Sequence, residues 1–130
     1  MNFPEPPARY PTAEAMASLA KRFDLPNHSN MQDWEYEVAD PDRIDEFVAA
    51  YLCGELGDDE RFTLMETILQ SFEELETRES DPRWHSLLET IASNLDLHIS
   101  TVYYWARLDA DNPDEMFRIS PSMRTLLRSS

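Results

Sequence analysis

Glycine and cysteine are scarce in this chain of 130 residues, which contains two glycines and one cysteine. Glycine supplies the left-handed backbone that tight hairpins, bulges and phosphate-binding loops need, so its scarcity favours helices over sheets. Cys53 alone cannot form an intrachain disulfide. The chain also lacks an apolar run of about 18 residues that would span a membrane, and its N-terminus lacks the basic and apolar regions of a secretory signal. We therefore expect a soluble, cytoplasmic protein.

Positive charge is scarce as well, because 26 acidic residues stand against 11 basic ones and the formal net charge is −15. Residues 31–60 alone hold 11 acidic residues and one basic residue, whereas residues 1–30 are balanced. Such a field repels nucleic acids and anionic membrane surfaces and attracts basic proteins. We therefore predict a basic protein partner and no binding to nucleic acid or to membranes.

Helix-start signals and helical periodicity recur along the chain. Four prolines among residues 1–11 favour an extended N-terminal arm. Thr12, Asp40 and Asp81 are capping residues, and behind each of them apolar residues recur at spacings of three and four. The predicted helices cover residues 12–23, 40–53, 58–76, 82–107 and 120–127. The expected fold is all-α, with a single compact domain over residues 1–130 that forms one bundle of four to five helices.

Two segments leave alternatives open. Residues 82–107 carry a continuous apolar seam, but Asn94, Asp96 and the β-branched residues that follow them permit either one helix or two. From Met31 to Val38, apolar residues alternate with acidic ones, as they do in a half-buried strand, but no partner strand is evident. We expect an extended or irregular segment there.

The apolar spacing also predicts core residues. Leu69 and Phe72 lie on the apolar stripe of the helix over residues 58–76. His98 lies on the seam of the next helix, where a histidine is usually a buried core residue bonded to a neighbour. The three histidines lack metal-ligand spacing, and no nucleophile motif surrounds Cys53 or a serine. We therefore predict no metal, no cofactor and no catalytic residue, and expect that the protein is not an enzyme.

The acidic block supplies the candidate binding residues. Random solubilising charge is mixed in sign, whereas residues 31–60 are almost purely acidic. Aromatic anchors ringed by charge are typical of interface hot spots, although packing in the core is the alternative for Trp34. Tyr103 and Tyr104 precede an acidic turn, and consecutive helical residues cannot all be buried. The predicted partner-binding residues are Asp33, Trp34, Glu35, Tyr36, Glu37, Asp42, Asp45, Glu46, Asp58, Asp59, Glu60, Tyr103 and Tyr104.

In character, the chain resembles the small acidic bacterial immunity proteins that neutralise cognate toxins, many of which are basic nucleases. The acidic helix that begins at Asp58 and the pair Tyr103–Tyr104 before an acidic turn are similar to features of the nuclease-immunity proteins. This resemblance implies a non-catalytic inhibitor that occludes a basic partner such as a toxin domain. A nucleic-acid mimic or a regulatory adaptor that blocks a DNA-binding protein is the alternative, and a small enzyme of unknown chemistry is the third hypothesis.

Overall fold

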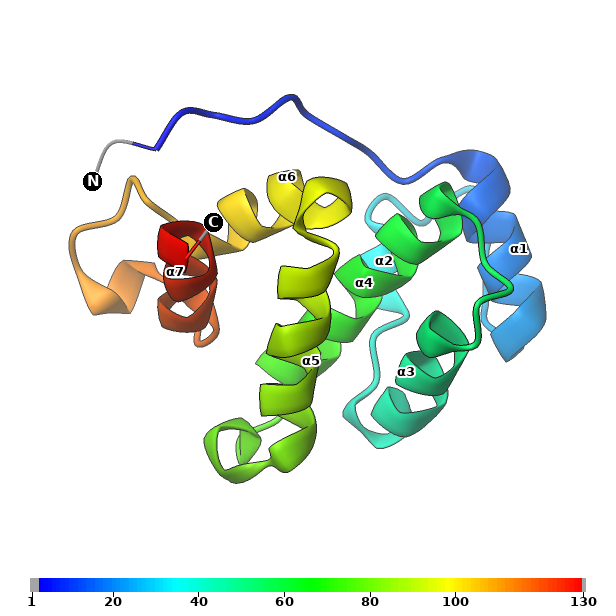
Figure 1. Ribbon diagram of the computed structural model, residues 1–130. Coiled ribbons are helices and arrows are strands. Elements are labelled where there is room, and N and C mark those ends of the chain that lie inside the picture. The colour runs from blue at the N-terminus through cyan, green and yellow to red at the C-terminus, as the bar shows by residue number, and fades with distance from the viewer. Residues whose placement is uncertain (1–2, 130) are drawn as a thin grey trace. The chain divides into compact units, whose positions relative to one another are not determined.

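The computed structural model describes residues 3–129 of the chain (Figure 1). Within this range there are seven α-helices and three short 3-10 helices, and there is no β-strand. The prediction of an all-α fold is therefore confirmed. By its backbone contacts the chain divides into two compact units: unit I is Tyr10–Leu75, and unit II is Met1–Arg9 together with Glu76–Ser130. The expected single bundle over residues 1–130 stays a prediction.

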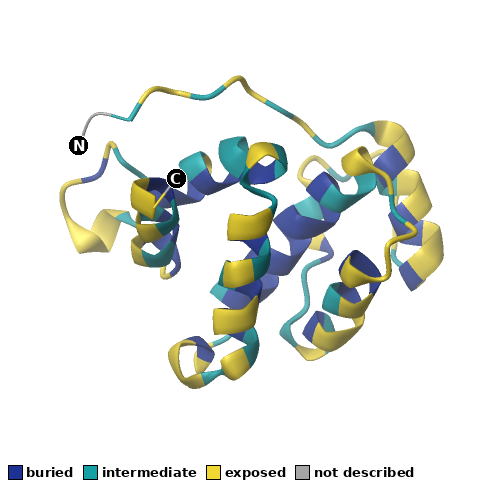
Figure 2. Cartoon of the chain, viewed as in Figure 1, coloured by how far each residue is buried: buried dark blue, intermediate teal, exposed yellow. Residues whose placement is uncertain are grey.

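Unit I is built around one long helix. Its elements are α1 (Ala13–Phe23), α2 (Trp34–Glu37), the 3-10 helix η1 (Pro41–Arg43), α3 (Ile44–Leu52) and α4 (Asp58–Glu73). The helices α1, α2 and α3 each pack on α4. All eight residues from Phe62 to Leu69 are buried, so two full turns of α4 are covered on every side (Figure 2). Leu69 and Phe72 are core residues, as predicted.

Unit II contains the second half of the chain. Its elements are η2 (Arg78–Ser80), α5 (Pro82–Ser93), α6 (Leu95–Ala106), η3 (Pro113–Glu115) and α7 (Ser120–Ser129). Helices α6 and α7 pack against each other, and α5 contacts both of them. The buried residues of α5 and α6 follow the predicted seam in part: Trp84, Ile91, His98, Val102 and Trp105 are buried, His98 as expected. Leu88 and Leu95 of the seam are only half-buried, whereas Leu87, Thr101 and Ala106 are buried off it.

The local signals act as the sequence predicts, except that Asp40 caps the 3-10 helix η1 and α3 begins only at Ile44. The side chains of Thr12, Asp40 and Asp81 each accept a hydrogen bond from a backbone N–H two or three residues further on, at 2.9 to 3.0 Å. These bonds satisfy N–H groups that have no partner inside the helix. Gly54 follows α3 with a φ of 80°, the left-handed conformation expected of a glycine there.

The structure has more helices than the four to five expected, for two reasons. The seam over residues 82–107 is two helices, because Asn94 leaves the helical region and its side chain donates to the carbonyl oxygen of Thr90 at 3.0 Å. The expectation of an extended or irregular segment from Met31 to Val38 was wrong for residues 34–37, which form a turn of helix. The N–H groups of Tyr36 and Glu37 both donate to the carbonyl oxygen of Asp33 at 2.9 Å, whereas a lone strand leaves such groups unbonded.

No helix in the described part of the chain combines the length and the apolar character that a membrane span requires.

Candidate functional site

The negative charge of the chain is concentrated in unit I. Residues 10–75 contain 16 acidic and 4 basic residues, a net charge of −12, out of −15 for the whole chain. Unit II contains 10 acidic and 7 basic residues, a net charge of −3. The predicted acidic site residues all belong to unit I, whereas Tyr103 and Tyr104 belong to unit II.

One group of predicted residues lies at the start of α3. Asp42 is on η1, and Asp45 and Glu46 are in the first turn of α3; all three are exposed. The opposite side of α3 is buried in unit I. The 3.6-residue period thus places the acids in solvent, as the sequence predicts, and their position at the helix start is favoured by the helix dipole.

Arg43 holds one of these acids in a structural contact. Its Nε and Nη2 atoms donate to the two carboxylate oxygens of Glu46, at 2.8 and 2.7 Å, and Nη2 also donates to the carbonyl oxygen of Phe23 at 2.7 Å. The guanidinium lies over the rings of Phe23 and Phe47, 5.9 and 5.5 Å from their centroids. These hydrogen bonds lower the pKa of Glu46. Glu46 therefore forms an ion pair with Arg43. Arg43 in turn links the start of α3 to the end of α1.

The two aromatic residues of α2 are held by contacts within unit I. Trp34 is 3% exposed, and its Nε1 donates to the carbonyl oxygen of Pro26 at 2.7 Å. Tyr36 is half-buried, and its hydroxyl donates to Oε2 of Glu66 at 3.2 Å. Of the two alternatives for Trp34, the structure therefore supports packing in the core, and this ring is not available as an exposed anchor.

The three acids of this segment repel one another. Asp33 and Glu37 are exposed and Glu35 is half-buried, and no basic residue lies between Asp33 and Glu37 in the sequence. Burial raises the pKa of Glu35; a backbone hydrogen bond opposes this rise, and the charges of Asp33 and Glu37 add to it. The segment is anchored despite this repulsion, because the hydroxyl of Thr67 donates to the carbonyl oxygen of Glu35 at 2.8 Å.

The acids at the start of α4 are also partly committed to the fold. Asp58 pairs with Arg61 at 2.8 Å. Glu60 accepts a hydrogen bond from the N–H of Gly57 at 3.2 Å and another from the hydroxyl of Ser18, on α1, at 2.6 Å. Asp59 is exposed. Asp58 and Glu60 thus stabilise the helix start and its attachment to α1, and Asp59 is displayed to solvent.

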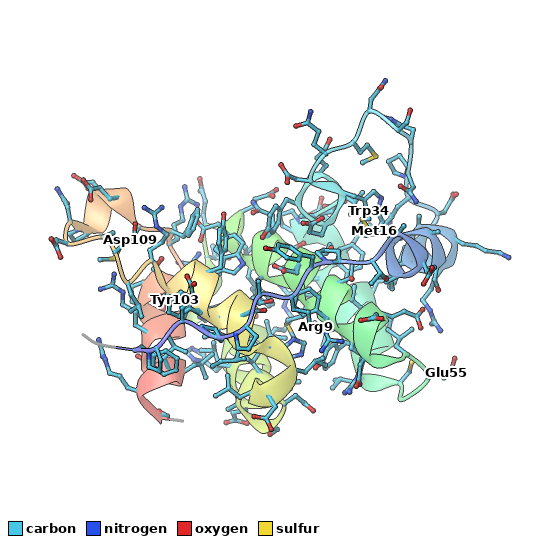
Figure 3. The ribbon with its side chains drawn as sticks, turned by 90° about the horizontal axis from the view of Figure 1, so that it is seen from above. Arg9, Met16, Trp34, Glu55, Tyr103 and Asp109 are labelled. Atoms are coloured by element: carbon cyan, nitrogen blue, oxygen red, sulfur yellow. The ribbon has the colours of Figure 1, made fainter. Side chains whose placement is uncertain are left out.

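The two tyrosines of unit II differ in exposure. Tyr103 is half-buried, and its ring lies 6.2 Å from the ring of Phe3, in the N-terminal segment of the same unit (Figure 3). Tyr104 is 51% exposed. The expectation that at least one of the pair reaches the surface is therefore confirmed.

Glu66, which is not among the residues predicted from the sequence, is a buried carboxylate on α4 that accepts the Tyr36 hydrogen bond. A signal for it exists in the sequence. Glu66 lies four residues after Phe62 and three before Leu69, on the apolar stripe of the helix. An acid on such a stripe is expected to be buried and to require a hydrogen-bond donor.

The described residues carry exposed charge, but they do not form a group of metal-binding side chains. Within residues 3–129, no three His, Cys, Asp or Glu side chains are grouped so that they could hold a metal ion. The exposed thiol of Cys53 donates to the carbonyl oxygen of Ala50 at 2.9 Å. Comparisons with protein-family models, with curated proteins and with solved structures found no match to the chain.

Proposed function

We propose that this protein is a non-catalytic acidic binding protein of the bacterial immunity type, which occludes a basic protein partner such as a toxin domain in the cytoplasm. The observation that carries the proposal is the net charge of −12 on unit I. The exposed predicted acids include Asp33, Glu37, Asp42, Asp45 and Asp59. The proposal includes the expectation that residues 1–130 act as one domain with an extended arm over residues 1–11.

The basic residues of unit I leave most of its negative charge uncompensated. Three of the four are already engaged in ion pairs: Arg22 with Glu55, Arg43 with Glu46, and Arg61 with Asp58. A net charge far from zero destabilises a compact fold by self-repulsion. A cationic partner reduces this repulsion, so the repulsion among the acids of the free protein favours formation of the complex.

The mechanism that follows is electrostatic and steric. A field of one sign steers an oppositely charged protein and raises its rate of association. Glu37 is on α2 and Asp45 is on α3, two helices that pack against α4, so little order has to be imposed on these carboxylates when a partner binds. The bound protein then blocks the partner's basic surface without any chemical step.

A pair of charge-matched variants tests the proposal. The first carries Asp33→Asn, Asp42→Asn and Asp45→Asn, three exposed acids of unit I. The control carries Glu76→Gln, Glu89→Gln and Asp96→Asn, three exposed acids of unit II, and so has the same net charge. Each protein is immobilised and used to capture proteins from a lysate of the source cell at low salt. We expect the parent and the control to retain a basic protein that the first variant does not retain.

The captured protein then decides between the hypotheses. If its expression alone stops growth and co-expression of this chain restores growth, the inhibitor proposal is supported. If it is a DNA-binding protein that duplex DNA displaces from this chain, the mimic or adaptor replaces the proposal. Equal capture by both variants contradicts a role for the charge of unit I.

A further inference from the structure

The end of α6 exposes an aromatic surface in unit II. The ring of Tyr104, 51% exposed, meets Trp105 edge-on at 5.7 Å and lies 5.8 Å from the ring of Phe117. Trp105 is buried and packs on Phe117 at 4.5 Å. The Tyr104 ring is therefore supported by two others while half of its surface faces solvent. An exposed ring that is held in place loses little conformational entropy when it binds.

This surface already binds a guanidinium group of its own chain. The side chain of Arg107 lies over the ring of Phe117, 5.6 Å from its centroid, and its Nε donates to Asp109 at 3.3 Å. Arg107 has a φ of 47°, in the left-handed region where glycine is normally preferred. The aromatic ring and the carboxylate thus form a working arrangement for one guanidinium, by cation–π attraction and an ion pair.

Further carboxylates follow Asp109 on the loop between α6 and α7, which extends from the helix ends in Figure 1 and carries Asp109 in Figure 3. The exposed acids of the loop are Asp109, Asp111, Asp114 and Glu115. The loop is tied down at its base, because Arg124 of α7 donates to the carbonyl oxygens of Ala106, Arg107 and Ala110. The acids therefore follow a loop start that is anchored at the end of α6, two residues after Tyr104.

We propose that Tyr104, Phe117 and the acids of residues 109–115 form a second contact surface, which takes up an arginine side chain of the basic partner. The arginine stacks on Tyr104 and pairs with a loop carboxylate, as Arg107 does with Phe117 and Asp109. Arginine fits better than lysine, because its planar guanidinium can stack on a ring and form directed hydrogen bonds at the same time. This inference rests on the proposed function and names the chemistry of the partner's contact.

The test uses the full chain and a synthetic peptide of alternating arginine and glycine as the probe. The control peptide has citrulline in place of arginine, which keeps the shape and removes the charge. We follow binding by the backbone amide signals of the protein in NMR spectra. We expect saturable shifts at Tyr104, Phe117 and residues 109–115 with the arginine peptide, and none with the citrulline peptide.

Substitutions of Tyr104 distinguish the contribution of its aromatic ring from that of apolar surface alone. Tyr104→Leu removes the ring and is expected to weaken binding of the arginine peptide about tenfold, whereas Tyr104→Phe retains the ring and the affinity. Tyr10→Leu changes a side chain that is 74% exposed in unit I and is the control. Thermal unfolding of each variant confirms that it is folded.

The outcomes distinguish this inference from the proposed function. If the peptide shifts only signals of the unit I acids, or if Tyr104→Leu binds as the parent does, the second contact surface is rejected while the role of unit I stands. If the peptide binds at Tyr104 as expected but the variant lacking three unit I acids captures the partner normally, the proposed role of unit I is rejected and the arginine contact stands.

Discussion

The guanidinium of Arg124 caps the end of a neighbouring helix: its Nε donates to the carbonyl oxygen of Ala106, the last residue of α6, at 2.7 Å. The same side chain donates to the carbonyl oxygen of Ala110 at 3.0 Å. The hydroxyl of Ser120, at the start of α7, donates to the carbonyl oxygen of Trp105 at 2.6 Å. Because the last carbonyls of a helix have no partner inside it, α7 supplies the bonds that α6 cannot make for itself.

Replacement of Arg124 is therefore expected to destabilise unit II. Arg124→Ala should lower the free energy of unfolding by about 2–3 kcal/mol, because several part-buried carbonyl groups lose a charged donor. Arg124→Lys should recover less than half of this loss, since an ammonium group cannot reach several carbonyls as a planar fork does. Chemical denaturation gives the values. Arg128→Ala, at an exposed position of the same helix, is the control, and an equal loss in both alanine variants contradicts the capping role.

Phe72 is expected to be a major contributor to the stability of unit I. Its side chain is fully buried on α4, so Phe72→Ala should cost about 3–5 kcal/mol through lost burial and the cavity that remains. Leu52→Ala, at a side chain that is 61% exposed on α3, should cost less than about 0.5 kcal/mol. Both values come from denaturation curves. A loss below about 1 kcal/mol for Phe72→Ala is incompatible with a close-packed core around α4.

The raised pKa of Glu35 predicts that Glu35→Gln stabilises the protein at neutral pH. The folded state favours the protonated carboxyl, because burial disfavours its charge, so ionisation at neutral pH lowers the free energy of unfolding. The advantage of the glutamine variant should shrink as the pH falls through the raised pKa and vanish below the unfolded value of about 4.3. Denaturation at neutral and acidic pH measures it. Glu14→Gln, on the exposed side of α1, is the control, and a less stable Glu35→Gln at neutral pH contradicts the assignment.

Asp81 is expected to behave in the opposite way. Hydrogen bonds from Arg83 lower the pKa of Asp81, so the ionised form stabilises the folded state. This contribution is complete above the unfolded pKa of about 4 and is lost as the pH falls through the lowered value.

Asp81→Asn isolates the charge, because asparagine is an equally good helix cap. This variant should be less stable than the parent at neutral pH, and the difference should close in acid. Asp81→Ala should lose about 1 kcal/mol more than Asp81→Asn, since the cap is lost as well. A difference between the parent and Asp81→Asn that stays constant with pH shows that the ion pair with Arg83 does not contribute.

The charge of unit I should control how fast a basic partner binds. Replacement of Asp33, Asp42 and Asp45 by asparagine should slow association, because the attraction between the two proteins is weaker. It should also flatten the salt dependence of the rate, because salt at about 0.1 M screens charges more than about 10 Å apart and the variant has fewer charges to screen. Tyr104→Leu should instead mainly speed dissociation. Kinetics at several salt concentrations, with the partner captured by the parent, separate the two effects. If the acid-depleted variant associates as fast as the parent at low salt, these carboxylates only keep the protein soluble.

The sequence by itself determined the helical class, the capping residues and most of the core, because these depend on neighbours within about four positions. Thr12, Asp40 and Asp81 cap helices where their side chains were expected to do so. Leu69 and Phe72 are buried because a stripe at helical spacing has to face the interior. The total charge and its concentration in residues 31–60 likewise follow from composition alone.

Tertiary structure decided which candidate residues are displayed and which are held. Trp34 is buried because its ring nitrogen meets the carbonyl of Pro26 across a turn, and no local spacing encodes that meeting. Glu46 is held because Arg43 reaches both its carboxylate and the distant carbonyl of Phe23. The Arg43–Glu46 pair is local, but the contacts of Trp34 with Pro26 and of Arg43 with Phe23 join segments that meet only when the chain folds. Packing therefore decided which of the many carboxylates stabilise the fold and which remain exposed to meet a partner.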